Sequence, residues 1–78
     1  MLLQINDKKA KTTTVVRVMM FERDDNSPSI KIWDMCDNTA IVTTKSAYDA
    51  ESCVRNLFSN ERATLNDAEI DWDHADNE

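Results

Sequence analysis

Hydrophobic positions recur along this chain with two different periods, and the change of period separates a strand-rich part from a helix. Three segments are dense in Thr, Val, Ile and aromatic residues, which favour strands: residues 12–22, 29–36 and 39–44. A turn-forming run that ends at Pro28 separates the first two, and Asp37-Asn38 separates the second from the third. The pattern predicts three antiparallel strands, and residues 2–5 are expected to add an edge strand.

The period becomes helical after residue 44. Ser46 has the side chain of an N-cap, and Asp49 occupies the position where a capping box carries an acid. The apolar positions that follow at helical spacing are Ala47, Ala50, Cys53, Val54, Leu57 and Phe58. The helix is expected to end at Asn60. The sequence therefore predicts one amphipathic helix of about fourteen residues, long enough to cover one side of a small sheet.

The turns suggest how the strands are paired. A two-residue turn in the second hairpin places Trp33 opposite Val42. An even closure of the first hairpin places Arg17 opposite Asp34, and these opposite charges support the register. One face of the sheet then carries mainly apolar side chains that the helix is expected to cover: Val16, Val18, Met20, Trp33, Met35, Ala40 and Val42.

The second face of the predicted sheet is also apolar. It collects Val15, Met19, Phe21, Ile30, Ile32 and Ile41. A single helix leaves this face open, and a patch of that size exceeds what soluble monomers usually expose. The chain's own ends, a second copy or a partner protein are expected to cover it. The residues of a possible homodimer interface are Met19, Phe21, Ile30, Ile32 and Ile41.

Charge is unevenly distributed. Residues 1–59 carry eight basic and eight acidic side chains, whereas residues 60–78 carry seven acids against Arg62 alone. The whole formal net charge of −6 therefore lies in the last segment. A neutral body with an acidic end indicates a positively charged partner rather than nucleic acid.

The acidic segment, residues 65–78, allows two interpretations. As a strand, it alternates Ala68, Ile70, Trp72 and His74 with Glu69, Asp71 and Asp73. As a short helix, it is capped by Thr64 and repeats Leu65, Ala68, Trp72 and Ala75 at helical spacing. We expect a compact β-β-β-α domain over residues 1–64, followed by this segment as a docked strand or short helix with a disordered end.

Enzymatic and cofactor chemistry are not expected. The chain contains no glycine, which excludes the loops that cradle phosphates. The acids of Asp67–Glu78 are spaced as in a calcium loop, but Trp72 stands where the sharp turn needs glycine. We expect no metal and no cofactor. Cys36 and Cys53 are too few for a disulfide framework and are expected to be reduced, in a cytoplasmic protein with no membrane-spanning segment.

Taken together, these features predict an α+β protein whose function is to bind another protein. We expect an acidic inhibitor, or mimic of nucleic acid, that occupies the basic surface of a nuclease or another nucleic-acid-binding protein. By analogy of size and charge alone, viruses of bacteria make such inhibitors, which would then act in the host cytoplasm. The expected partner-binding residues are Asp67, Glu69, Asp71, Trp72, Asp73 and Asp76. A homo-oligomeric assembly component and a small sheet-based nucleic-acid binder are the alternatives, and no direct contact with nucleic acid or membrane is expected.

Overall fold

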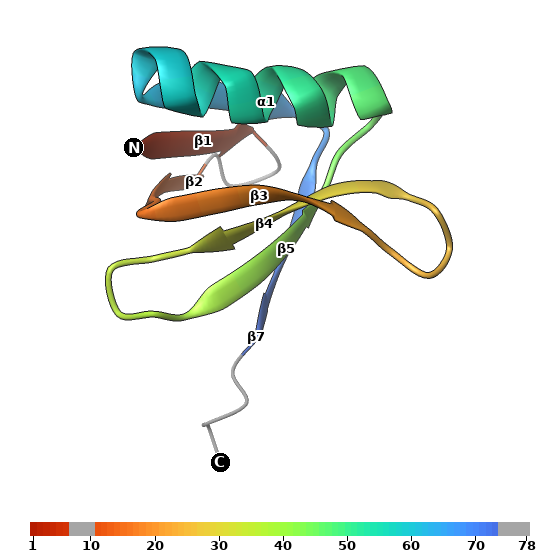
Figure 1. Cartoon of the computed structure of the whole chain (residues 1–78), viewed down its shortest axis with the longest axis horizontal. Helices are drawn as coiled ribbons and strands as arrows, with labels where there is room; N and C mark the ends of the chain where they lie inside the picture. The colour runs from red at the N-terminus through yellow and green to blue at the C-terminus, as the bar shows by residue number, and fades with distance from the viewer. Residues whose placement is uncertain (7–10, 74–78) are drawn as a thin grey trace.

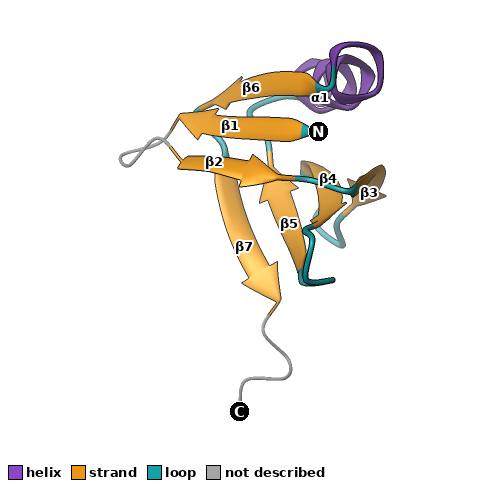
Figure 2. Ribbon diagram, turned by 90° about the vertical axis from the view of Figure 1, so that its left-hand side faces the viewer, coloured by secondary structure: helices purple, strands orange, loops and turns teal. Residues whose placement is uncertain are grey.

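The computed structural model describes residues 1–6 and 11–73, in which one helix packs on two β-sheets that cross one another (Figure 1, Figure 2). The elements are β1 (Leu2–Asn6), β2 (Lys11–Thr14), β3 (Arg17–Glu22), β4 (Pro28–Trp33), β5 (Thr39–Thr43), α1 (Ala47–Asn60), β6 (Arg62–Asn66) and β7 (Glu69–Asp73). One sheet has the order β2-β1-β6 and the other β3-β4-β5-β7. The predicted α+β architecture, with a small antiparallel sheet and one helix, is confirmed. The three-stranded sheet was not predicted, and β1 is its central strand rather than an edge.

The chain passes from one sheet to the other at Val15-Val16. The Val15 N–H donates to the carbonyl of Met1 (2.7 Å), beside the three-stranded sheet, and the Val16 N–H donates to the carbonyl of Trp33 (2.9 Å) in the four-stranded sheet. Such bends form the corners of crossed sheets. The single strand predicted over residues 12–22 is therefore two strands, β2 and β3.

A second corner lies between β6 and β7. Asp67 has a left-handed backbone (φ 58°), which Asp tolerates better than most residues, and its N–H donates to the carbonyl of Asn6 (3.3 Å). For the segment after residue 64, the strand interpretation is confirmed over Glu69–Asp73. The expected boundary between residues 64 and 65 falls inside β6, which pairs in parallel with β1. The expected disorder of the chain's end concerns residues 74–78, which lie outside the described residues.

The predicted strand register is wrong in both hairpins. Arg17 pairs with Trp33 rather than with Asp34, and Trp33 pairs with Thr39 rather than with Val42. The first hairpin is shifted by one residue and the second by three. A shift by an odd number of residues exchanges the two faces of a strand. Two odd shifts add up to an even one, so β3 and β5 keep their predicted faces relative to each other. Only β4 has its two faces exchanged. As a result Ile30 and Ile32 are fully buried in the core (0 % exposed).

The loop between β4 and β5 explains the larger error. Asp34 does not belong to a strand, because its carboxylate accepts hydrogen bonds from the N–H of Cys36 (2.9 Å), the N–H of Asn38 (2.9 Å) and the Asn38 side-chain amide (3.1 Å). Partial burial opposes ionisation of Asp34, but these hydrogen bonds outweigh it and lower its pKa. The side chain therefore closes a longer loop over residues 34–38 in place of the two-residue turn.

The helix lies where the sequence places it. The Ser46 hydroxyl accepts a hydrogen bond from the N–H of Asp49 (3.1 Å), and the helix ends at Asn60, both as predicted. Three helical side chains are buried against β3, β4 and β6: Ala50, Cys53 and Leu57. Ala47 and Phe58, which were expected on the same apolar face, are exposed instead.

The two cysteines differ sharply in their surroundings. Cys36 is exposed, whereas Cys53 is 2 % exposed, and burial raises the pKa of the Cys53 thiol to about 11. We expect a thiol reagent to modify Cys36 in the native protein and Cys53 only after unfolding. The folded state favours the neutral thiol, so this stabilisation is complete below the unfolded pKa of 9.0 and is lost as the pH rises toward about 11.

Urea unfolding measured from pH 8 to pH 11 checks the Cys53 prediction, and a Cys53→Ala variant is the matched control. The variant should lose this component of the alkaline decline, while the titration of other groups remains. Rapid modification of Cys53 in native buffer would contradict the buried position.

Candidate protein-binding face

The four-stranded sheet has a solvent side that faces away from α1 and the core, here called the outer face (Figure 2). Strand pairing aligns its side chains in rows across β3, β4, β5 and β7. One row is Arg17, Trp33, Thr39 and Asp73, and the next is Met19, Lys31, Ile41 and Asp71. The face is therefore ordered from basic residues at one side to acidic residues at the other.

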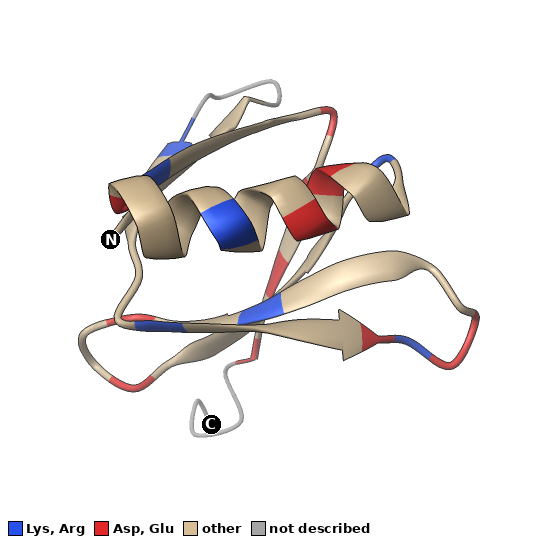
Figure 3. Ribbon diagram, turned by 45° about the horizontal axis from the view of Figure 1, so that its top comes forward, with Lys and Arg blue, Asp and Glu red and all other residues tan. Residues whose placement is uncertain are grey.

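The acidic side of the outer face is the edge strand β7. Glu69, Asp71 and Asp73 are exposed and alternate with Ile70 and Trp72, which are half-buried against the core. Residues two apart on a strand are separated by about 6.6 Å, from a rise of about 3.3 Å per residue. Because β7 pairs with β5 along its length, these three carboxylates, here called the acidic row, are held in order along one edge of the sheet. Figure 3 marks the acidic positions of the described residues in red on the ribbon.

The other expected partner-binding residues lie elsewhere. Trp72 points to the inner side and packs against the core, so it holds β7 in place and is not available on the acidic side. Asp67 lies at the corner between β6 and β7, where its carboxylate is 3.8 Å from the Lys45 ammonium group. Asp76 lies outside the described residues. The structure thus brings together Glu69, Asp71 and Asp73 alone from the predicted set.

The basic side of the outer face surrounds Trp33. The Arg17 guanidinium lies 4.6 Å from the centre of the Trp33 ring, and the Lys31 ammonium lies 5.3 Å from it. Both distances are typical of cation–π contacts, which hold the long side chains against the sheet. The expected pairing of Arg17 with Asp34 does not form. This cluster was not predicted, because the register predicted from the sequence turns Trp33 and Lys31 toward the core.

Apolar side chains also lie on the outer face, two on the edge strand β3 and one on the central strand β5. Met19, Phe21 and Ile41 lie there as predicted, and Met19 is the most exposed of the three (46 %). The prediction that Ile30 and Ile32 lie beside them in an interface is wrong, because β4 is turned over and both side chains are buried in the core. The apolar part of the face is therefore smaller than predicted, and charged side chains border it on two sides.

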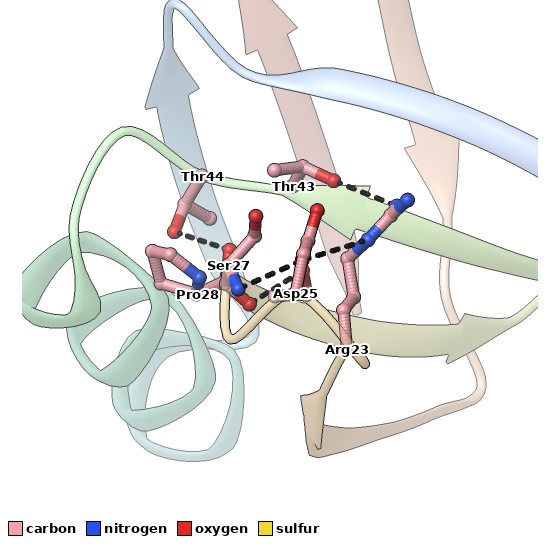
Figure 4. A network of polar contacts seen from close by, with 7 residues as sticks. Arg23, Asp25, Ser27, Pro28, Thr43 and Thr44 are labelled. Atoms are coloured by element: carbon pink, nitrogen blue, oxygen red, sulfur yellow. Dashed lines mark hydrogen bonds and ion pairs between the residues drawn. The ribbon is translucent and has the colours of Figure 1, made fainter.

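The loop between β3 and β4 bounds one end of the outer face (Figure 4). Arg23 donates to the Thr43 hydroxyl (3.3 Å) and lies 3.7 Å from the Asp25 carboxylate, which accepts a hydrogen bond from the Ser27 N–H (3.0 Å). The Ser27 hydrogen bonds and then Arg23 lower the pKa of Asp25, so this carboxylate stays charged. A shallow depression of about 390 Å³ lies beside the loop, lined by Phe21, Arg23, Asp24, Asp25, Ile41 and Asp71.

Comparison with models of protein families, with curated proteins and with solved structures finds no match to this chain. Within residues 1–6 and 11–73, no group of three His, Cys, Asp or Glu side chains is arranged to hold a metal ion. In the same residues, no helix is both long enough and apolar enough to cross a membrane. What can be inferred about function therefore comes from the outer face itself.

Proposed function

We propose that this protein is a non-enzymatic binding protein whose acidic row occupies a basic surface on a protein that binds nucleic acid. The observation that carries the proposal is the pairing of β7 with β5, which fixes Glu69, Asp71 and Asp73 in one line. Its setting is the cytoplasm, of a host cell if the chain is viral, which suits two free thiols.

The spacing and rigidity of the acidic row support the proposal. Duplex DNA carries one phosphate per about 3.4 Å of axis on each strand, and the carboxylates repeat at about 6.6 Å, roughly every second phosphate by this measure. Side chains fixed on a strand lose less conformational entropy on binding than the same charges on a flexible tail. A basic groove shaped for a nucleic-acid backbone is a surface that such a row fits.

Electrostatic attraction supplies the rate of association more than the affinity. Charge complementarity raises association rates by about 10–10³-fold at low salt, and ions screen it over about 8 Å at physiological ionic strength. Affinity requires apolar groups that lose their water on binding, and Met19 and Ile41 lie in the row that ends at Asp71.

Neutralising the acidic row tests the proposal. The variant Glu69→Gln, Asp71→Asn, Asp73→Asn keeps the shape of all three exposed side chains and removes three negative charges. We expect immobilised wild-type protein to retain nucleic-acid-binding proteins from lysate at 50 mM salt, and the variant to retain at least about 10-fold less. Wild-type capture should fall steeply with salt, and the remaining capture by the variant should not.

The matched control is Glu22→Gln, Glu51→Gln, Glu61→Gln, which removes the same charge from exposed positions outside the acidic row. It should retain the partner like the wild type. Excess duplex DNA should release the captured protein, because DNA and the acidic row compete for the same basic surface on that protein. Equal loss in both triple variants, or capture that DNA does not affect, would refute recognition through the acidic row. A gel shift of DNA by the purified protein itself would instead favour the nucleic-acid binder.

A further inference from the structure

The outer face carries charges of opposite sign on its two sides, so it is complementary to a second copy of itself. Arg17 and Lys31 lie on β3 and β4, and Asp71 and Asp73 lie on β7 at the opposite edge. The strand order β3-β4-β5-β7 fixes this separation. A surface that carries basic side chains on β3 and β4 and acidic side chains on β7 can pair with a reversed copy.

Three two-fold arrangements of this sheet can be compared by their charges. Antiparallel pairing of one β7 edge with another places two acidic rows side by side, which repel each other. Stacking two outer faces about an axis perpendicular to the strands places Asp71 over Asp71 and Lys31 over Lys31. Stacking about an axis parallel to the strands places β7 over the β3 of the other copy and β5 over its β4. Only this last arrangement brings opposite charges together.

We propose that two copies of this chain associate through their outer faces about an axis parallel to the strands. The rows of the sheet then align across the interface, because rotation about this axis keeps positions along the strands unchanged. Arg17 of each copy meets Asp73 of the other, and Lys31 reaches toward Asp71 of the other. In the next row Met19 lies over Asp71 of the other copy and Lys31 over Ile41, so Lys31 approaches Asp71 from the neighbouring strand.

The size of the face makes this a weak dimer. Four strands about 4.8 Å apart, with about six residues of about 3.3 Å each, present roughly 400 Å² of sheet. Stable interfaces bury about 800 Å² per partner. We therefore expect a weak dimer with a dissociation constant on the order of 100 µM. One consequence rests on the proposed function: a partner that takes the acidic row competes with the second copy for the same carboxylates.

Charge reversal followed by mixing tests the dimer. Arg17→Glu faces Asp73 across the interface, and Asp73→Arg faces Arg17, so each single variant places like charges opposite each other twice per dimer. Sedimentation equilibrium from 10 µM to 2 mM should show wild-type dimers and at least about 10-fold weaker association in either variant. An equimolar mixture of the two variants should recover the association, because both contacts in the mixed dimer are then complementary.

The double variant Arg17→Glu, Asp73→Arg should also recover homodimers. The mixture makes misfolding an insufficient explanation, since a misfolded variant would not regain the interface with the other. Monomers throughout the concentration series, or association that the single variants leave unchanged, would overturn the proposal. These measurements need no partner, whereas partner capture is measured at concentrations far below 100 µM, so one proposal can fail while the other stands.

Discussion

A chain that ends at Asn60 is expected to be unfolded in dilute buffer, although it keeps the helix and the β3-β4-β5 part of the four-stranded sheet. The truncation removes β6, which is paired with β1 along its whole length, and the β6 side chains Ala63 and Leu65 belong to the core. It also removes Glu61, whose backbone carbonyl accepts a hydrogen bond from the Leu2 N–H (2.9 Å). Burial of a Leu side chain alone contributes about 1.5–3 kcal/mol. The truncation also removes β7 and the core contacts of Ala68, Ile70 and Trp72. A domain of this size has a stability of about 4–12 kcal/mol, so the combined loss exceeds what it can withstand.

Far-UV circular dichroism and urea titration measure the effect of the truncation. The control is a chain that ends at Asp73, which keeps every strand of both sheets and should unfold cooperatively. A cooperative transition of the chain that ends at Asn60 would mean that the residues after it form an appendage. The expected unfolding also decides how binding is tested: because removal of residues 61–78 destroys the fold, charge-neutral substitutions are the appropriate tool.

The sequence predicts the helix accurately because its signals are local. A capping side chain lies three residues from the N–H that it binds, and an apolar stripe at helical spacing is visible within one segment. Ser46 and Leu57 therefore lie where the pattern places them. Phe58 is exposed (66 %) because the helix turns Ala50, Cys53 and Leu57 toward the core, and the position after Leu57 points away from it.

Strand register was harder to predict because it depends on loops. The hydrogen bonds of the Asp34 carboxylate lengthen one loop and turn β4 over. Lys31 is a signal in the sequence against the predicted register. That register places Lys31 on the same side as Trp33, toward the core. A buried unpaired ammonium group is strongly unfavourable, and this argument alone favours the observed face for Ile30 and Ile32.

The corners and the parallel pairing of β6 with β1 depend on contacts between distant parts of the chain. Arg62–Asn66 alternates exposed and buried residues, which is a strand pattern, but Thr64 and Leu65 also fit the start of a helix. The alternation of Glu69–Asp73 is visible in the sequence and supports the strand, one of the two interpretations that the pattern left open. The basic half of the outer face could not be inferred without the correct register, and this half makes the face complementary to itself.

Replacement of Ile32 by Ala is expected to lower the free energy of unfolding by about 2–5 kcal/mol, because Ile32 is fully buried on a central strand and the truncation leaves a cavity. The matched control is Ile41→Ala on the adjacent strand β5. Ile41 lies on the outer face and is half-buried, so its truncation should cost less than about 1.5 kcal/mol. Urea titrations at 5 µM, where the proposed dimer is dissociated, compare the two at unchanged m-value. The register predicted from the sequence places both side chains on the same open face and requires similar small effects. A cost for Ile41→Ala equal to that for Ile32→Ala would therefore argue against the observed orientation of β4, and against the arrangement of Lys31 and Trp33 on the surface that both proposals use.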